Sequence, residues 1–419
     1  MLTPGVCASR VHRQGEIRPL PCLLSRSPPA LTPGPESHPL SNNRPILRAR
    51  MRKDLAMSDR SKRMAWTALL LAALLPLVVS LPAAAQLQWS SKDNKQSLKF
   101  GILGQMQAES ADVAGSKDTS QNLFFRRLRL ILGFSLSDQL SIFFDTDDPN
   151  LGKATNGVKD TGTIFVQDFV ATYKFAKELQ LDGGLLLMEQ DYNHNQSAAS
   201  LMTLDYGAYT FNESTPTTSR TGRDYGLRAR GYVADDHLEY RLGVYQGVRG
   251  TNNSNDFRYA GRLMYTFFTP QVGIFYRGTS LGKTQSLSIG GSFDKQKDYT
   301  NYAGDVYLDQ PLGGGNSLVL QGDYNQIDGG KFLTTLPKQD DVLIEAGFYI
   351  ASVKLQPFIQ YASEDFKDPL RVDEKRSTAG LAYFASGHNN NLKLSYTRIE
   401  PKHGDSRKQI NLQWQVFQF

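Results

Sequence analysis

The last eleven residues of the chain decide how the rest is interpreted: Gln409-Ile410-Asn411-Leu412-Gln413-Trp414-Gln415-Val416-Phe417-Gln418-Phe419. For most of this stretch, apolar and polar side chains alternate. A period of two is typical of a β-strand with one apolar and one polar face. The apolar positions are Ile410, Leu412, Trp414, Val416 and Phe417. Such a strand can end a soluble β-sandwich or close a barrel, so the preceding sequence has to separate the two.

An apolar run near the N-terminus, Trp66 to Leu81, has basic residues before it and Ala83-Ala84-Ala85 after it. This order is that of a secretory signal peptide, with cleavage expected after Ala85. A transmembrane helix is the alternative, but Pro76 interrupts the run, which is shorter than the roughly 20 residues a spanning helix needs. We therefore expect a signal peptide over residues 57–85 and an exported mature chain.

Residues 1–56 are rich in Pro, Arg and Ser and show no periodicity, so we expect a start-site extension or a disordered leader. The formal charge of +6 comes from the residues before Gln86, which include twelve Lys or Arg and four Asp or Glu. The remaining chain has 35 basic and 37 acidic residues and is therefore slightly negative. The charge balance therefore gives no reason to expect a nucleic-acid partner. Both cysteines, Cys7 and Cys22, also lie in the leader, which excludes a disulfide framework or thiolate metal site downstream.

The exported part, residues 86–419, reads as an all-β protein. No window in it is apolar enough for a membrane helix, and alternating segments are separated by Gly, Asn, Asp and Pro. The predicted strands are sixteen: 97–108, 122–135, 139–147, 163–175, 179–188, 223–233, 237–248, 256–268, 284–296, 299–309, 316–326, 341–351, 354–364, 374–385, 391–400 and 407–419.

The connections between these strands favour a transmembrane antiparallel β-barrel. When the N-terminus lies in the periplasm, odd-numbered connections face outside and are long, and even-numbered ones are tight turns. The short even connections are Ser135–Gln139, Phe175–Leu179, Val233–His237, Ala351–Lys354 and Ala385–Asn391. The long odd ones are Ala108–Asn122, Thr146–Thr163, Met188–Arg223 and Ile327–Asp341. Two connections break the rule, because Thr269–Lys283 is too long and the one near Asp298 is too short.

The two faces of the predicted strands differ in the way a barrel requires. In strand 122–135, Leu128 and Leu130 alternate with Arg127 and Arg129. In a transmembrane barrel the apolar face meets lipid and the charged face lines the lumen. Tyrosines near strand ends are expected to form interfacial girdles; they are Tyr232, Tyr245, Tyr265, Tyr299, Tyr361 and Tyr396. Sixteen strands leave a water-filled channel, so the count predicts a wide pore.

Basic residues on the polar faces are the predicted anion-binding, pore-lining set. Guanidinium stays charged and offers a planar fork to phosphate or carboxylate, and a row of them in a narrow passage attracts anions. The set is Arg127, Arg129, Arg228, Arg230, Arg241, Arg258 and Arg262. The alternative is a generic wall with charges of both signs. The acidic residues Asp145, Asp147, Asp148 and Asp168 are expected at a solvated loop edge, since their spacing lacks a complete metal-ligand set.

The third outer connection, Glu189 to Gly222, is the candidate constriction loop. A loop of this length inside a compact protein is usually functional or disordered. It carries Asp191, Tyr192, His194, Asp205, Tyr206, Tyr209 and Glu213. We expect it to fold into the barrel and narrow the pore.

Three short motifs carry a resemblance to a known family: Phe124-Phe125-Arg126-Arg127-Leu128-Arg129-Leu130 with Gly133, Gly222-Arg223-Asp224-Tyr225-Gly226-Leu227, and Gly278-Thr279-Ser280-Leu281-Gly282-Lys283. Together with the terminal aromatic strand, they resemble the phosphate-selective porins of the porin O/P family. The resemblance extends over residues 86–419 and implies a sixteen-stranded, trimeric outer-membrane channel for phosphate or other anions. The family's basic constriction loop is not matched, because Glu189 to Ser219 holds no Lys or Arg.

The sequence thus predicts a porin in the outer membrane of a Gram-negative-type bacterium, which lets small hydrophilic solutes diffuse with a bias to anions. The expected partners are outer-membrane lipid and lipopolysaccharide, the barrel-assembly machinery through the C-terminal strand, phosphate or other small anions, and further copies of the chain. No cofactor and no catalytic residue are expected. His237 and His388 are interpreted as solvated turn histidines, and Gly278 to Thr284 as a turn rather than a phosphate-binding loop. The alternatives are a non-selective porin, or a plugged barrel acting as an adhesin or lipid hydrolase.

Overall fold

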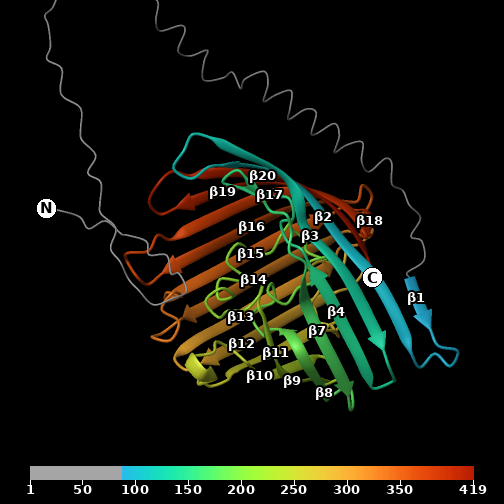
Figure 1. Cartoon of the computed structure of the whole chain (residues 1–419). Helices are drawn as coiled ribbons and strands as arrows, with labels where there is room; N and C mark the ends of the chain where they lie inside the picture. Colours follow the sequence, from blue (N-terminus) through green and yellow to red (C-terminus); the bar gives the residue numbers. More distant parts are fainter. Residues whose placement is uncertain (1–86) are drawn as a thin grey trace, which may run out of the picture. The chain divides into compact units, whose positions relative to one another are not determined.

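The computed structural model of the chain describes residues 87–419 (Figure 1). The predicted leader, 1–56, and signal peptide, 57–85, lie outside the described residues. Within residues 87–419, no helix has the length and apolar character needed to span a bilayer.

Sixteen antiparallel strands close into a barrel, because the last strand pairs with the first. The closing register runs from Ile102↔Gln418 to Ala111↔Gln409. The barrel strands are β2 (Ser97–Asp112), β3 (Thr119–Ser135), β4 (Leu140–Asp147), β7 (Phe165–Lys174), β8 (Gln180–Leu187), β9 (Arg223–Val233), β10 (Leu238–Tyr245), β11 (Arg258–Phe268), β12 (Ser286–Gln296), β13 (Tyr299–Pro311), β14 (Ser317–Asp328), β15 (Gln339–Tyr349), β16 (Leu355–Phe366), β17 (Glu374–Tyr383), β19 (Asn390–Pro401) and β20 (Arg407–Gln418). The all-β prediction and the sixteen strands are confirmed.

Four short strands and one long hairpin were not predicted. β1 (Leu87–Ser90) pairs with the beginning of β2, and β5 (Ala154–Thr155) pairs with β6 (Val158–Lys159) inside the connection after β4. β18 (Ala385–His388) precedes β19. β2 and β3 continue pairing as far as Asp112↔Thr119, so their connection is shorter than expected.

The outward faces of the strands are apolar. Leu227 is 71% exposed and Ile359 59%, and residues at equivalent positions include Leu242, Leu263, Ile289, Ile344 and Leu394. A continuous outer surface of this kind suits a hydrocarbon environment. Tyr265 and Tyr396 are exposed and Tyr361 is half-buried, so the girdle prediction stays a prediction for these three. It is wrong for Tyr232, Tyr245 and Tyr299, which are buried because strand alternation turns them inward, where each hydroxyl finds a hydrogen-bond partner.

One end of the barrel carries mostly short turns and the other mostly long connections. The two predicted exceptions are present: residues 269–285 form a long connection at the short-turn end, and 297–298 a tight turn at the other. Two segments occupy the lumen. They are residues 188–222, which Figure 1 shows in green to yellow inside the ring of strands, and residues 269–285.

Candidate functional site

The inner wall is divided into a charged half and an amide half. Every buried arginine of the described chain lies on β3, β9, β10 or β11. From β14 through β20 to β2, the buried polar side chains are mainly carboxamides and hydroxyls. The amide half comprises Gln321, Asn325, Gln339, Gln356, Ser363, Asn391, Ser395, Thr397, Asn411, Gln413, Gln415, Gln105 and Gln107. Lys393 is the one lysine that is buried within residues 87–419.

Two predicted arginines on β9 share one carboxylate on β8. The Nε atoms of Arg228 and Arg230 lie 2.9 and 2.8 Å from Oδ2 of Asp182. Arg228 also reaches the first residue of the predicted loop, with Nη1 3.0 Å from Glu189 Oε1. Tyr245 donates its hydroxyl to the same carboxylate at 2.7 Å. The start of the loop is therefore bound to the charged wall through a network of charge-assisted hydrogen bonds.

The arginines on β10 and β11 connect the wall to both lumen segments. Arg241 is paired with Glu239 at 2.8 Å and donates to Asn195 Oδ1 and to the carbonyl of Ile274. It thus contacts residues of 188–222 and of 269–285 at once.

Arg262 has the same bridging role one strand further on. Its two Nη atoms lie 2.6 and 2.8 Å from the carboxylate of Asp305. Nη1 also donates to the Gln190 carbonyl at 2.8 Å, and Nε to the Tyr276 hydroxyl at 3.0 Å. Arg258, at the beginning of the same strand, is also buried and pairs with Asp294, Nε to Oδ1 at 2.7 Å.

A β-bulge explains how two consecutive arginines of β3 reach one loop carboxylate. The pairing of β2 with β3 skips Arg126 between Gln105↔Arg127 and Met106↔Phe125. A bulge re-aims the extra side chain, and both Arg126 Nε and Arg127 Nη2 lie 2.6 Å from Asp205. Although burial raises the pKa of the Asp205 carboxyl, the two guanidinium charges lower it more, so that its pKa lies well below the usual range.

The acidic residues near β4 are not at a solvated edge, so that prediction is wrong. Asp147 and Asp145 lie 2.8 and 3.4 Å from the guanidinium of Arg129, and all three side chains are buried. Asp168 pairs with Arg223 at 3.0 Å. Counting alternate positions back from Arg228 along β9 places residue 223 on the outward face. For this reason Arg223 was not among the predicted pore-lining arginines.

All seven predicted arginines therefore contact groups inside the barrel, and each is buried beside at least one carboxylate. Burying a guanidinium is costly unless it is paired and hydrogen-bonded. These pairs compensate the charge of the arginine row locally.

On the amide half, Lys393 holds the middle of the loop. Its Nζ donates to the carbonyls of Leu201 and Thr203 at 2.6 and 2.7 Å. The Thr203 hydroxyl donates to Glu345, 3.3 Å away. Further along, Asn212 donates to Asp341 and Glu364, and Tyr209 to Glu374. The loop thus crosses from the charged half to the amide half.

The end of the loop depends on a glycine. Gly222 has φ +74° and leaves no room for a Cβ, which would lie 2.1 Å from His194 Nε2. His194 is fully buried and lies 4.6 Å from the Phe211 ring, centroid to centroid. A side chain at position 222 would displace this packing.

The unexpectedly long connection 269–285 pairs with the loop. Ser197 N donates to the Tyr276 carbonyl at 2.9 Å, and Tyr276 N donates to the Asn195 carbonyl at 2.8 Å. The Tyr276 ring is stacked on Tyr192 at 5.0 Å, and Tyr192 on Tyr307 at 4.3 Å. The two lumen segments therefore form one packed unit.

Of the two turn histidines, His388 differs from the prediction, and His237 is half-buried. His237 Nδ1 lies 2.5 Å from the Thr266 carbonyl. His388 is half-buried, lies 2.9 Å from the Thr279 carbonyl and contacts the Phe384 ring, so it joins its turn to the 269–285 segment rather than being solvated. Gly278 to Thr284 has no helix behind it, in agreement with the prediction of a turn.

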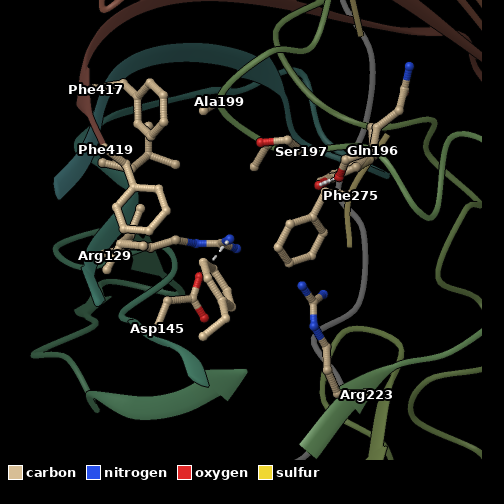
Figure 2. A pocket seen from close by; sticks show the side chains of 14 residues that line it. Arg129, Asp145, Gln196, Ser197, Ala199, Arg223, Phe275, Phe417 and Phe419 are labelled. Atoms are coloured by element: carbon tan, nitrogen blue, oxygen red, sulfur yellow. Dashed lines mark hydrogen bonds and ion pairs between the residues drawn. The ribbon is translucent and has the colours of Figure 1, made fainter. Parts of the chain in front are cut away.

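The C-terminal aromatic residues lie on the inner face. Figure 2 shows Phe417 and Phe419 beside a niche of about 120 Å³, into which the guanidinium groups of Arg129 and Arg223 point. Phe417, which was counted among the apolar positions of this strand, lies on the inner face because the odd positions of β20 face inward. Phe419 fits because Gly101 has no side chain: a Cβ there would lie 2.7 Å from the Phe419 ring.

Open space remains at both ends of the amide half. At the long-connection end, a cavity of about 460 Å³ lies between β2, β3, β16, β17, β19, β20 and loop residues 204–212; we call it the vestibule. At the short-turn end, a second cavity of about 540 Å³ is lined by residues 277–284 and 386–389. Along the chain, Lys393 lies between Asn389, which lines the second cavity, and Thr397, which lines the vestibule. Lys393 and the loop carbonyls that it binds therefore lie between the two cavities.

A closed barrel of sixteen antiparallel strands with an apolar outer face and a polar, loop-narrowed interior is the fold of outer-membrane porins. Solved structures of that class are similar to the chain. An anion-selective porin from Comamonas acidovorans is 13% identical with a TM-score of 0.53, over 77% of this chain and 100% of that one. OmpF of Salmonella typhi, in complex with daunomycin, is 12% identical with a TM-score of 0.53, over 78% and 100%.

The outer-membrane channel DcaP of Acinetobacter baumannii is 11% identical with a TM-score of 0.50, over 78% of this chain and 99% of that one. No protein-family model matches the chain. The comparison with curated proteins found no match either. These similarities show the fold.

Proposed function

We propose that the chain is an outer-membrane porin through which small hydrophilic solutes diffuse. The observation that carries the proposal is the combination of an apolar outer surface with a polar lumen that is hollow at both ends. An outer surface with exposed Leu227 and Ile359 is stable in contact with lipid, and polar cavities are stable when they are filled with water. The export signal expected over residues 57–85 agrees with this location.

The finer parts of the proposal are a bias to anions, including phosphate, and assembly as a trimer. They rest on the resemblance to the porin O/P family and on the seven arginines. Those arginines are paired with carboxylates. The preference for anions therefore depends on the positive charge that the carboxylates leave uncompensated, not on the sum of the seven arginine charges. Lipopolysaccharide and the barrel-assembly machinery remain expected partners.

A barrel closed to solutes is the second candidate, and the pairing of 188–222 with 269–285 across the lumen favours it. Single-channel recording of refolded residues 86–419 in a planar bilayer separates the two. A porin gives discrete conductance steps, and its reversal potential in a chloride gradient gives the sign of its selectivity. Added phosphate tests block. Absence of any current from correctly folded barrels would overturn the porin proposal and leave the closed barrel.

A further inference from the structure

The vestibule contains two clusters in which two arginines share one carboxylate. On one side Asp205 lies between Arg126 and Arg127, each at 2.6 Å. On the other, Glu374 lies between Arg376 at 2.8 Å and Arg407 at 2.6 Å. Counting only the ion-paired groups, each cluster keeps one positive charge in excess, in contrast to Arg129, which lies against two carboxylates. At the second cluster, the nearby carboxylate of Glu364 offsets part of this excess.

One arginine of each cluster, Arg126 or Arg376, is more accessible than the buried arginines of the charged half. The Arg126 side chain is 26% exposed and Arg376 35%, whereas Arg228 and Arg241 are fully buried. Arg126 and Arg376 also line the vestibule. A dissolved anion can therefore reach positive charge at Arg126 and Arg376, whereas the predicted arginines are buried, including Arg127, which also lines the vestibule.

Besides these clusters and one ion pair, Lys153 with Glu109 at 2.9 Å, the vestibule wall offers neutral hydrogen-bonding groups. The vestibule is lined by the carboxamides of Gln107, Gln360 and Asn411 and by the hydroxyls of Thr378 and Thr397. Carboxamides and hydroxyls both donate and accept, as the hydroxyl groups of a sugar do. On the loop side, the rings of Tyr206 and Phe211 line the same cavity and contact each other edge to face at 5.1 Å.

We propose that the vestibule is a binding site for a polyhydroxylated carboxylate, such as a sugar acid, which is held by its charge at one arginine cluster and by its hydroxyls along the amide wall. The inference rests on the proposed function, since it names the solute class of the same pore. A volume of about 460 Å³ lies in the range of small-molecule sites, roughly 300–1,000 Å³. A bare inorganic anion would leave the carboxamides and the aromatic rings without a partner, so the organic acid fits more of the wall.

The experiment is calorimetric titration of the folded barrel in detergent with gluconate, glucose and inorganic phosphate. The test variant is Arg126→Gln/Arg376→Gln, which removes the excess charge of both clusters but leaves each carboxylate paired with Arg127 or Arg407. The control is Arg398→Gln, a change at an exposed arginine outside the vestibule. We expect gluconate to bind, glucose to bind more weakly, and the double variant to lose about tenfold or more in gluconate affinity while the control does not.

Equal gluconate affinity in the wild type and in the folded double variant would overturn the assignment of the charge. Phosphate binding as tightly as gluconate would overturn the role of the amide wall. Single-channel currents recorded in parallel distinguish the two proposals. Conductance without gluconate binding would reject the binding site and support the porin. Gluconate binding without conductance would support the binding site and reject the porin.

Discussion

Arg262, like Arg241, fastens both lumen segments to the barrel wall, and its replacement by Met should loosen them. The substitution keeps the unbranched aliphatic part of the side chain but leaves Asp305 buried without its cation, which costs about 3–5 kcal/mol. The Gln190 carbonyl loses its donor as well, at about 1–3 kcal/mol if it stays dry. Both penalties fall on the docked state alone, because water reaches these groups once the segments move away.

The strand pairing of the barrel does not involve the Arg262 side chain, so the penalty acts on docking rather than on barrel stability. At about 1.4 kcal/mol per factor of ten, the lost ion pair shifts the docking equilibrium by roughly a hundred- to several-thousand-fold. We expect a larger mean single-channel conductance and more frequent current fluctuations in Arg262→Met. The heat-modifiable mobility of the folded barrel in gel electrophoresis should be unchanged.

Two further variants make the test specific. Arg262→Met/Asp305→Leu removes the unpaired carboxylate and should restore part of the wild-type behaviour, since the larger penalty disappears. Arg398→Met changes an exposed arginine and should behave like the wild type. If folded Arg262→Met has the unitary conductance and fluctuation frequency of the wild type, the inference that Arg262 controls docking is refuted.

Three further predictions concern charge, pH and packing. Replacing Arg228, Arg230 and Arg241 together with Ala leaves their carboxylate partners uncompensated, so the reversal potential should move towards cation preference; an unchanged potential in a folded variant would show that these residues do not act on the passage. Because the pKa of Asp205 is lowered in the folded state, its contribution to loop docking is complete above the ordinary carboxyl pKa and is lost only as pH falls through the lowered value. Conductance should therefore show no step from Asp205 between pH 7 and about pH 4, whereas Asp205→Asn should already have the altered conductance at pH 7. Gly101→Val places atoms where the Phe419 ring lies, so the yield of folded barrel on refolding should fall, while Gly104→Val, at a position with free space around it, should fold normally.

The strands were predictable because a residue that faces lipid and one that faces the lumen alternate along each of them. That local rule located all sixteen strands and the inward side of Arg127 and Arg129. The anomalous length of 269–285 was visible too, although its pairing with Ser197 was not, since nothing local specifies a partner some 80 residues away.

The partners of the arginines could not be predicted for a related reason. Which carboxylate faces Arg228 depends on the register between β8 and β9, which brings Asp182 opposite it, and the sequence gives no register. The bulge at Arg126 reverses the alternation by one residue, so counting along the strand excludes a side chain that contacts the lumen loop. Tyr232 and Phe417, in contrast, lie on the inner face through ordinary alternation, because the pairings of β9 and β20 contain no bulge at these residues.

The arrangement along one edge of β2 has a consequence for protein engineering. β20 pairs with this edge only as far as Ile102, and β1 pairs with the remainder, from Ser97 to Phe100. Any residues fused after Phe419 would continue along the same backbone groups and compete with Leu87–Ser90 for them. A purification tag at the C-terminus is therefore expected to displace β1, whereas a tag within the 402–406 turn leaves both pairings intact.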